Sequence, residues 1–478
     1  MKIVMAAVEC APFVKVGGLA DVIGALPKEL VKLGHEVAVM LPKYSLIPEK
    51  YEEDFELIGE VEIFFKHETK TCSIFEYQLD GVRYFFLGND GYYNRDRVYW
   101  HTDDAERYAF FSRAVLAIMQ KLELAPDILH VHDWHAAMLP FLVREDPQYQ
   151  TLSENLKTMV TIHNLQYQGP YSREMFLSSF EMDERYFDEG TVEWNGKFNM
   201  LKTGILYADR VTTVSPTYRD EILTEQYGEK LHPLLQEKQA DLIGILNGID
   251  TAAYNPATDL LIEREYDHTS IEEKAANKRA IQEKFELPER GDIPMLTMVS
   301  RLSSQKGIDV LMETLPDVLE KEELQFVLLG SGEEKNEQFF RDLAINYPEK
   351  VAIYLGFDEA LAHLLYAGAD IFLMPSHFEP CGLSQLISLR YGTVPVANKT
   401  GGLKDTIEEY DENRRAGTGF LSDFAQGESF IAALQRALAL YQKTEHWGAI
   451  KQNGMTGDYS WAHSAKEYAK EYERLVRG

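Results

Sequence analysis

Two stretches of this sequence, far apart along the chain, each place a lysine two residues before a pair of glycines. "KVGGLAD" spans residues 15–21 and "KTGGLKD" spans residues 399–405, and each follows an apolar run. A helix that begins at such a turn offers backbone N–H groups and a partial positive charge, and glycine lets a ligand approach the backbone closely. Lysine adds a mobile cation suited to phosphate. We therefore expect Lys15, Gly17 and Gly18 to contact a phosphate or a sugar; the alternative interpretation is a tight corner with a solvated lysine.

A second cationic stretch, "SRLSSQKGIDVL", begins at Ser300 and follows the apolar run "PMLTMVS". Arg301 and Lys306 lie in the expected loop, and Gly307 opens the expected helix. Two cations and a glycine at the carboxyl end of a strand match what a diphosphate needs. Each cation taken singly has the alternative of being a solvated surface charge.

A carboxylate and a cysteine stand together in "SHFEPCGLSQL", which begins at Ser376 after the apolar run "ADIFLMP". Glu379 precedes the expected helix start, where the helix dipole favours a negative charge. Cys381 has no recognisable partner base, so we expect it to pack rather than to act as a nucleophile.

The histidines suggest a competing hypothesis, a metal site. In "HVHDWH", His130 and His132 are two apart on an expected strand and so share a face. The run approaches the H-x-H-x-D-H pattern of binuclear zinc hydrolases, but Trp134 stands where that pattern has its aspartate. We therefore expect core packing for His130, and hydrogen bonding at the edge of a binding site for Asp133 and His163.

The composition restricts the classes of partner. The chain has 478 residues, 45% of them hydrophobic, and a formal net charge of -29. Such a charge repels phosphate backbones and anionic lipids, so we expect neither nucleic acid nor a membrane as a partner. In so acidic a protein, the lysines and arginine grouped in the two cationic stretches are more conspicuous as candidate contacts for an anion. No signal peptide is recognisable, and the three cysteines form no C-x-x-C pair, so we expect a soluble protein in the reducing cytoplasm. These cysteines are Cys10, Cys72 and Cys381.

The elements that must position these residues are short apolar runs, each followed by a loop and a helical pattern. Seven such runs, from "KIVMAAV" to "LIGILNGI", occupy the first half, and five, from "PMLTMVS" to "TVPVANK", occupy the second. Runs without polar alternation are typical of parallel strands buried on both faces. Residues 255–292 are polar, and we expect them to form a surface connection with one helix in "SIEEKAANKRAIQEKF". The fold class is therefore α/β, with two doubly wound domains in tandem.

Seven motifs in order resemble the bacterial glycogen synthases and plant starch synthases, a family that uses ADP-glucose. The resemblance covers nearly the whole chain, from Lys2 to about Tyr459. The motifs are "KVGGLADVIGALP", "HVHDWHA", "TIHNLQYQG", "ILNGID", "SRLSSQKGID", "FEPCGLSQL" and "KTGGLKDT".

The resemblance implies the fold called GT-B, in which two Rossmann-like domains face a deep interdomain cleft. It implies an N-terminal, acceptor-side domain over residues 1–245 and a C-terminal, donor-side domain over residues 246–459. It also implies that a last helix, within residues 460–478, crosses back to the N-terminal domain.

Roles carry over onto matching positions. The turn at Lys15 resembles the loop that contacts the donor phosphate and glucose, Arg301 and Lys306 resemble the pair that neutralises the diphosphate, and Glu379 resembles the residue that holds the transferred glucose. The residues for which the resemblance implies a catalytic role are Lys15, His163, Arg301, Lys306 and Glu379. Those for which it implies substrate binding are Gly17, Gly18, Asp21, Asp133, Asn247, Phe357, Cys381, Gly382, Leu383, Ser384, Thr400 and Gly401.

Three positions depart from the family's pattern. The first is Val16, which stands in "KVGGL" where "KTGGL" is commoner. Phe357 stands beside the expected adenine site, where the family often has tyrosine. Phenylalanine can still stack on the base but lacks the hydroxyl of tyrosine. Ile387 stands where related glycosyltransferases often have a second glutamate, so ribose recognition is expected to come from elsewhere.

The implied reaction transfers α-glucose from ADP-glucose to the non-reducing end of an α-1,4-glucan such as glycogen, with retention of the anomeric configuration. No metal ion or other cofactor is expected, because the cations stabilise the departing ADP. Three alternatives remain: a related enzyme that uses a UDP-sugar, a non-catalytic protein that binds glucan or nucleotide, and a zinc hydrolase built on the histidines.

Overall fold

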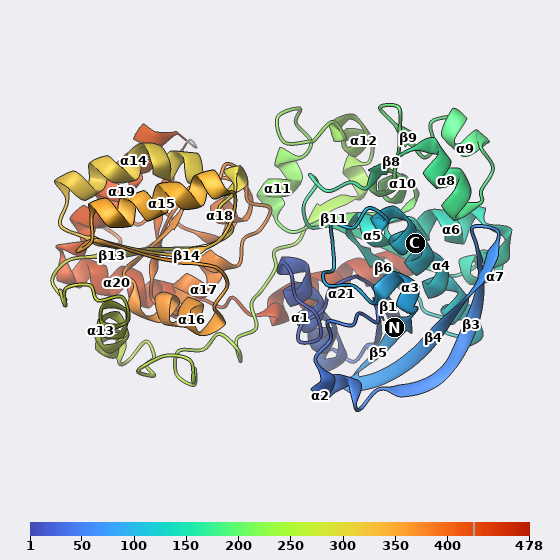
Figure 1. The fold of residues 1–478 in the computed structure, drawn as a ribbon, viewed down its shortest axis with the longest axis horizontal. Helices are drawn as coiled ribbons and strands as arrows, with labels where there is room; N and C mark the ends of the chain where they lie inside the picture. The colour runs from blue at the N-terminus through green and yellow to red at the C-terminus, as the bar shows by residue number, and fades with distance from the viewer. Residues whose placement is uncertain (424–425) are drawn as a thin grey trace. The chain divides into compact units, whose positions relative to one another are not determined.

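The computed structural model describes residues 1–423 and 426–478, and these form two compact units. The first unit comprises residues 1–247 and 461–478, and the second comprises residues 248–460. The colour gradient of Figure 1 separates them, with blue to green for most of the first unit and yellow to orange for most of the second. Among the helices of the described residues, none combines the length and the apolar character needed to cross a bilayer.

The first unit is built on a nine-stranded sheet with the order β12-β11-β7-β6-β1-β2-β5-β4-β3. All neighbours from β12 to β5 are parallel, and β4 and β3 extend the sheet as an antiparallel edge. A separate small sheet has the order β8-β10-β9. The strands are β1 (Lys2–Ala6), β2 (Glu36–Pro42), β3 (Glu56–Phe65), β4 (Glu68–Leu79), β5 (Val82–Gly88), β6 (Ile128–His132), β7 (Lys157–Ile162), β8 (Pro170–Tyr171), β9 (Glu193–Trp194), β10 (Lys197–Asn199), β11 (Arg210–Thr213) and β12 (Leu242–Gly244).

The second unit has a six-stranded, fully parallel sheet with the order β15-β14-β13-β16-β17-β18. Counted along the chain from β13, this is the order 3-2-1-4-5-6 of a Rossmann fold. The strands are β13 (Met295–Val299), β14 (Gln325–Gly330), β15 (Val351–Leu355), β16 (Ile371–Met374), β17 (Val394–Asn398) and β18 (Phe420–Ser422).

Helices cover both faces of the second sheet, as a buried parallel sheet requires. In Figure 1, α14, α15 and α19 lie on one face and α13, α16 and α17 on the other. The helices of this unit are α13 (Lys274–Lys284), α14 (Ile308–Lys321), α15 (Glu334–Asn346), α16 (Glu359–Gly368), α17 (Ser384–Arg390), α18 (Gly401–Thr406), α19 (Gly427–Tyr441) and α20 (Thr444–Met455), with short 3-10 turns at Ile271–Glu273 and Ser304–Lys306.

In the first unit the helices α1 and α21 pack against each other, although they come from opposite ends of the chain. Trp461, Tyr468 and Tyr472 of α21 belong to the same hydrophobic core as β1 and β6. The helices of this unit are α1 (Gly18–Lys32), α2 (Glu49–Glu52), α3 (Asp90–Tyr93), α4 (Asp104–Lys121), α5 (Asp133–Ala136), α6 (Leu139–Glu145), α7 (Gln150–Ser153), α8 (Arg173–Phe180), α9 (Arg185–Asp188), α10 (Met200–Tyr207), α11 (Pro216–Glu221), α12 (His232–Glu237) and α21 (Trp461–Arg477), with 3-10 turns at Pro147–Tyr149 and Gln239–Asp241.

All twelve predicted apolar runs contain a strand of one of the two main sheets. The helix predicted within residues 255–292 is confirmed as α13, but the prediction that this region lies on the surface is wrong for the polar side chains of α13 that are buried. Lys274 and Lys278 are both buried, and Lys274 Nζ donates to the carbonyl oxygens of Tyr366 and Ala367. Burial of these lysines is tolerated because neighbouring oxygens accept their hydrogen bonds.

Candidate functional site

Several of the predicted site residues follow the strands at which each main sheet reverses its order. In the first sheet, β1 leads to β2 on one side and β6 lies on the other, and in the second sheet β13 lies between β14 and β16. Ligands of open α/β sheets bind at such switch points, outside the carboxyl ends of the strands. Lys15 follows β1, Asp133 follows β6, Arg301 follows β13 and Glu379 follows β16. We refer to the residues at these two places as the first half-site and the second half-site.

The turn before α1 carries the exposed residues Lys15, Gly17 and Gly18 of the first half-site. Lys15 Nζ lies 2.6 Å from Asp21 Oδ1, so the two predicted residues form an ion pair across the first turn of the helix. A Cβ placed on Gly17 would come no closer than 4.0 Å to Glu9 Oε1, which leaves open space above the turn. The turn therefore presents an exposed cation and accessible backbone.

Glu9 accepts hydrogen bonds from backbone N–H groups of the turn that we predicted to be free for a ligand. Its Oε2 accepts from the backbone N–H groups of Val16 at 2.6 Å and Gly17 at 2.7 Å, and Tyr99 Oη donates to its Oε1. The prediction of unpaired N–H groups is thus wrong for these two residues, because a buried carboxylate of the protein already satisfies them. Sequence reasoning missed Glu9, although a carboxylate directly after a buried strand was a signal for it.

Asp133 and His163 lie side by side in the first half-site. Asp133 Oδ1 accepts from the backbone N–H of His163 at 2.8 Å, and His163 Nε2 lies 3.0 Å from Nδ1 of His132. Burial raises the pKa of Asp133 to about 7 against the lowering effect of that backbone hydrogen bond, and the charge of Glu9 raises it further. Desolvation lowers the pKa of His163 to about 3, so its ring is neutral at pH 7. The pair offers hydrogen bonds rather than a fixed cation.

His130 is fully buried, and both of its ring nitrogens are engaged. Nδ1 lies 2.7 Å from Tyr472 Oη and Nε2 lies 2.6 Å from Thr161 Oγ1. Burial lowers its pKa to about 3. Within residues 1–423 and 426–478, no group of three or more His, Cys, Asp or Glu side chains is arranged to hold a metal ion. His130 therefore acts as a core residue and is not available to a metal.

Asn247 follows β12 at the end of the first unit and is buried. Its side-chain oxygen has no hydrogen-bond partner among the described residues. A buried amide oxygen without a donor is costly, so the geometry suits a ligand hydroxyl there.

An ion pair holds together the two loops of the second half-site. Lys306 Nζ lies 2.6 Å from Glu379 Oε2, and Ser376 Oγ donates to the same oxygen at 3.1 Å. Glu379 is only 5% exposed, so the pair is held in a largely dry environment. The structure thus joins two residues that lie 73 positions apart in sequence and that we predicted separately. Ser376, which helps to fix the carboxylate, was not predicted.

The loop after β13 can lie this close to the loop after β16 only because residue 307 is glycine. Gly307 has φ +69°, and a Cβ there would lie 1.9 Å from the carbonyl oxygen of Pro375. The backbone N–H of His377 also donates to Gln305 O at 3.0 Å. Arg301 is exposed on the same loop, and the described residues provide no ion-pair partner for its guanidinium. It is thus placed to meet an external anion.

The remaining predicted residues of the second half-site are packed around the turn at Glu379. Thr400 and Cys381 are buried, and the backbone N–H of Gly402 donates to the carbonyl oxygen of Glu379 at 3.0 Å. Packing accounts for Cys381, as predicted from its lack of a base. Gly382, Leu383, Ser384 and Gly401 lie within this turn or at the starts of α17 and α18.

Phe357 lies after β15, at the opposite side of the second sheet's switch point from β16, and its side chain is 84% exposed. Its ring is therefore available for stacking at the carboxyl edge of this sheet. No contact in the described residues links it to the Lys306–Glu379 pair.

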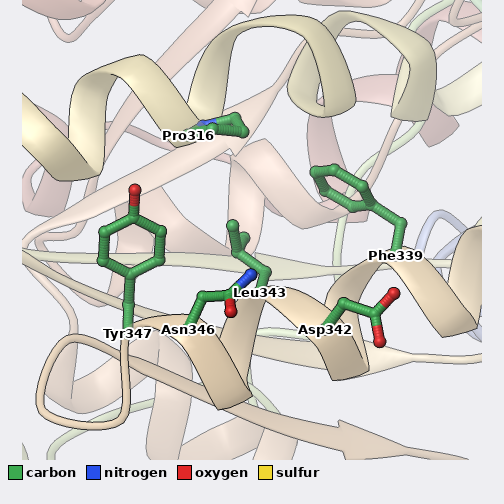
Figure 2. A pocket seen from close by; sticks show the side chains of 6 residues that line it. All are labelled: Pro316, Phe339, Asp342, Leu343, Asn346 and Tyr347. Carbon is green, nitrogen blue, oxygen red and sulfur yellow. The ribbon is translucent and has the colours of Figure 1, made fainter.

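A surface hollow of about 480 Å³ lies elsewhere in the second unit. Figure 2 shows Pro316 of α14 on one side of it and Phe339, Asp342, Leu343 and Asn346 of α15, with the following Tyr347, on the other. None of these residues is among the predicted ones, so the hollow is separate from both half-sites.

Two family models match the chain. The model described as the starch synthase catalytic domain matches residues 2–237, and the model described as glycosyl transferases group 1 matches residues 280–453. A glycogen synthase of Bacillus cereus is 46% identical over 476 residues, which cover 100% of both chains. A glycogen synthase of Anoxybacillus flavithermus is 45% identical over 478 residues, which cover 100% of this chain and 99% of the relative.

The fold agrees with solved structures over the whole chain. The catalytic domain of starch synthase IV from Arabidopsis thaliana, bound to ADP and acarbose, superposes with a TM-score of 0.92 at 34% identity and covers 100% of this chain and 99% of its own. Sucrose-phosphate synthase from Thermosynechococcus elongatus, at 18% identity and a TM-score of 0.63, shares the fold, with coverage of 100% and 99%. The full-length identity, the matching models and the two Rossmann-like units together show that this chain belongs to the glycogen and starch synthase family of GT-B glycosyltransferases.

Proposed function

We propose that the protein transfers α-glucose from ADP-glucose to the non-reducing end of an α-1,4-glucan, with retention of configuration, and so extends glycogen. The observation that carries the proposal is the Lys306–Glu379 pair at the switch point of a Rossmann sheet. The pair lies at the edge where ligands of Rossmann sheets bind, which supports the proposal that Lys306 meets the diphosphate and that Glu379 binds a sugar hydroxyl. The ADP of the Arabidopsis relative and the glycogen synthase names of the bacterial relatives support the choice of donor and acceptor.

The difficult step is the departure of ADP, during which negative charge grows on the distal phosphate oxygen. Lys306 and Arg301 are placed to stabilise this charge, since both follow β13 at the carboxyl edge of the second sheet. We propose that Lys15 serves the same reaction from the first half-site. Fixed cations of this kind stabilise a leaving group without a metal ion, so we propose that neither a metal nor another cofactor is needed.

We propose that retention arises from attack on the same face of the sugar, through a short-lived ion pair. A double displacement needs a free carboxylate close to the anomeric carbon. Glu379 Oε2 already accepts from Lys306 and Ser376, which lowers the nucleophilicity of the carboxylate and suits it to holding a sugar hydroxyl through Oε1. The departing phosphate oxygen then takes the proton of the acceptor hydroxyl.

We propose that adenine stacks on the exposed Phe357. The ring is 84% exposed at the carboxyl edge of the sheet that carries the second half-site.

We propose that the protein works in the cytoplasm. Cys10, Cys72 and Cys381 are buried free thiols, which fits a reducing compartment.

The proposal is tested by measuring glucose incorporation into glycogen from ADP-glucose and from UDP-glucose. We expect transfer from ADP-glucose to be strongly preferred. Lys306→Ala should lower the rate about 100- to 1000-fold, the usual result of removing one stabilising donor from a developing anion. Lys335→Ala is the matched control, because this lysine is exposed on α15 and outside both half-sites.

The outcomes separate the alternatives. A strong preference for UDP-glucose would assign the protein to a related transferase. If the protein binds glucan or nucleotide but transfers no glucose, and if Lys306→Ala leaves this binding unchanged, it is a binding protein and not an enzyme. Stoichiometric zinc in the purified protein would revive the hydrolase hypothesis.

A further inference from the structure

An exposed tryptophan lies beside the first half-site in a backbone conformation that bulky residues rarely adopt. Trp100 is 72% exposed and has φ +71°, within the left-handed region. Strain of this kind persists only where the surroundings enforce it, and it is commonest at functional sites. An exposed indole is also costly in itself, since its apolar surface remains in water. Both costs must be offset by some other interaction of this residue.

A buried ion pair enforces the conformation of Trp100. Asp104 Oδ2 accepts from the backbone N–H of Trp100 at 2.8 Å and from that of His101 at 3.2 Å. Asp104 Oδ1 accepts from Arg107 Nη1 at 2.6 Å, and the fully buried Arg107 also donates to the carbonyl oxygens of Tyr92 and Val98. This network fixes the loop and keeps the indole outside the core.

A second exposed ring meets Trp100 from a different loop. Tyr167, which is 36% exposed, follows β7, and its ring centroid lies 6.3 Å from that of Trp100 at an interplanar angle of 71°. The Tyr167 loop is fixed in turn, because the backbone N–H of Tyr167 donates to Asn164 O at 3.2 Å and that of Gln166 donates to Asn164 Oδ1 at 3.0 Å. Two ordered loops thus present one aromatic surface, which we name the Trp100–Tyr167 platform.

Residues next to the platform in sequence connect it to the first half-site. Tyr99, the neighbour of Trp100, donates to the Glu9 carboxylate that holds the Val16 and Gly17 amides. The ring of Tyr99 also lies 5.1 Å from that of His135, within the helix that Asp133 begins. Tyr167 is only four residues from His163. A ligand on the platform would therefore lie next to the predicted sugar-binding residues.

Several charges beside Trp100 are paired within its loop, Asp103 with Arg95 at 3.0 Å and Asp104 with Arg107. Arg97 is exposed on the same loop and has no ion-pair partner among the described residues, so a phosphate-bearing ligand must be tested beside a neutral sugar. Aromatic rings offer a large, rigid apolar surface, which matches the C–H face of a glucose ring.

We propose that the Trp100–Tyr167 platform binds a glucose unit of the α-glucan acceptor by stacking, and that it positions the chain end at the first half-site. The proposal rests on the proposed function, since it names the part of that site that receives the acceptor. It makes Trp100 a determinant of acceptor affinity and leaves the donor to other residues.

The test uses the full-length protein and compares Trp100→Gly with Trp100→Phe. Glycine adopts φ +71° without strain, so Trp100→Gly removes the ring and leaves the loop conformation favoured. Phe64→Ser is the control, because Phe64 is an aromatic residue 59% exposed on β3 of the same unit. Calorimetry measures the binding of maltoheptaose and of ADP, and rate measurements give KM for maltoheptaose and for ADP-glucose.

For Trp100→Gly we expect the Kd and KM for maltoheptaose to rise about tenfold, which is the scale of one lost aromatic contact. We expect ADP binding and the KM for ADP-glucose to stay within about twofold of wild type. The Kd and KM of Trp100→Phe for maltoheptaose should lie between those of wild type and those of Trp100→Gly. Unchanged maltoheptaose binding in Trp100→Gly, with transfer intact, would overturn the platform and leave the proposed function standing. Weaker ADP binding with unchanged maltoheptaose binding would show that the platform holds the nucleotide instead. If wild type neither binds maltoheptaose nor transfers glucose, the proposed function and the platform both fail.

Discussion

At the scale of single residues, Glu379 illustrates how contacts restrict the chemistry of a carboxylate. Its Oε2 accepts hydrogen bonds from Lys306 Nζ and Ser376 Oγ, and its burial is nearly complete. For Glu379→Gln we expect kcat to fall about 10- to 100-fold, the effect of losing one charge-assisted hydrogen bond. Steady-state kinetics on glycogen measure this loss.

The same residue discriminates between the two retaining mechanisms. Incubation of wild type with a 2-fluoro analogue of the donor, followed by mass spectrometry of the peptide that contains Glu379, should detect no glucosyl adduct. A covalent adduct on Glu379 would show that it is the nucleophile and that same-face attack is wrong.

Asp133 makes stability depend on pH near neutrality. Burial raises its pKa to about 7, above its value in the unfolded chain. The folded state therefore binds the proton more tightly, and the stabilisation is complete below about pH 4 and is lost as the pH rises through about 7. We expect this group to lower the free energy of unfolding by up to about 1.4 kcal/mol per pH unit in that window.

Asp133→Asn should flatten this part of the pH profile, because the amide keeps an oxygen for the His163 N–H and does not titrate. Urea unfolding followed by tryptophan fluorescence from about pH 4 to about pH 8 measures the difference. Trp100, Trp134, Trp194 and Trp461 lie in the first unit, so the signal reports mainly on it. Parallel profiles for variant and wild type would contradict the assignment.

At the scale of elements, the start of α18 packs directly against the turn that carries Glu379. Gly401 has φ +45°, and a Cβ there would lie 1.9 Å from the carbonyl oxygen of Glu379. For Gly401→Ala we expect a loss of stability of about 1–3 kcal/mol from backbone strain and a lower activity, since the turn must move. Thermal unfolding and the glycogen assay measure the two effects.

Gly448→Ala is the matched control for Gly401→Ala. Gly448 lies within α20, and a Cβ there meets nothing within 4 Å. Alanine in a helix interior is favoured over glycine, so we expect stability to stay equal or to rise by about 0.5–1 kcal/mol. Equal behaviour of the two variants would show that the α18 contact does not position the turn.

The contrast between buried and edge strands accounts for what the sequence predicts about this fold. The strands β13 and β16 are apolar on both faces, so their runs are conspicuous and the loops after them are identifiable as a site. The strands β3 and β4 were missed, because they are exposed on one face and mix polar with apolar residues. Their alternating pattern was a signal, but a search for continuous apolar runs does not detect it.

The residues of the candidate site also fall into those that the sequence predicts and those that it does not. Lys306 and Glu379 lie in glycine-containing turns directly after buried strands, where a charged side chain is poorly placed for packing and well placed for a ligand, so residue type and spacing predict them. Trp100 carries no such pattern, and Glu9 shows only its position directly after a buried strand; the importance of both becomes clear from contacts with residues distant in sequence, Tyr167 for Trp100 and Tyr99 for Glu9. Only the folded chain reveals that one carboxylate organises a turn and that an indole is held in water.

At the scale of the whole molecule, the last helix of the chain stabilises the unit formed by the beginning of the chain. Tyr472 of α21 is buried, and its Oη lies 2.7 Å from Nδ1 of the buried His130 in β6. For Tyr472→Phe we expect the first unit to lose about 1–3 kcal/mol, because His130 is left with an unsatisfied buried nitrogen. Hydrogen exchange should accelerate in peptides that contain β6 and remain unchanged in those that contain β14.

Removal of residues 461–478 extends this prediction from one hydroxyl to a whole helix. The truncation takes Trp461, Tyr468 and Tyr472 out of the core of the first unit, and each large aromatic lost from a core costs about 3–5 kcal/mol. We expect the first unit to unfold or to exchange freely, while β13 to β17 keep their protection, since the second unit has hydrophobic clusters of its own. Arg477→Ala is the control, because this side chain is exposed and pairs only with Glu473 among the described residues. Loss of protection in both units together would show that the two cores fold as one, whereas retained protection of β6 would show that α21 is dispensable to the unit it packs on.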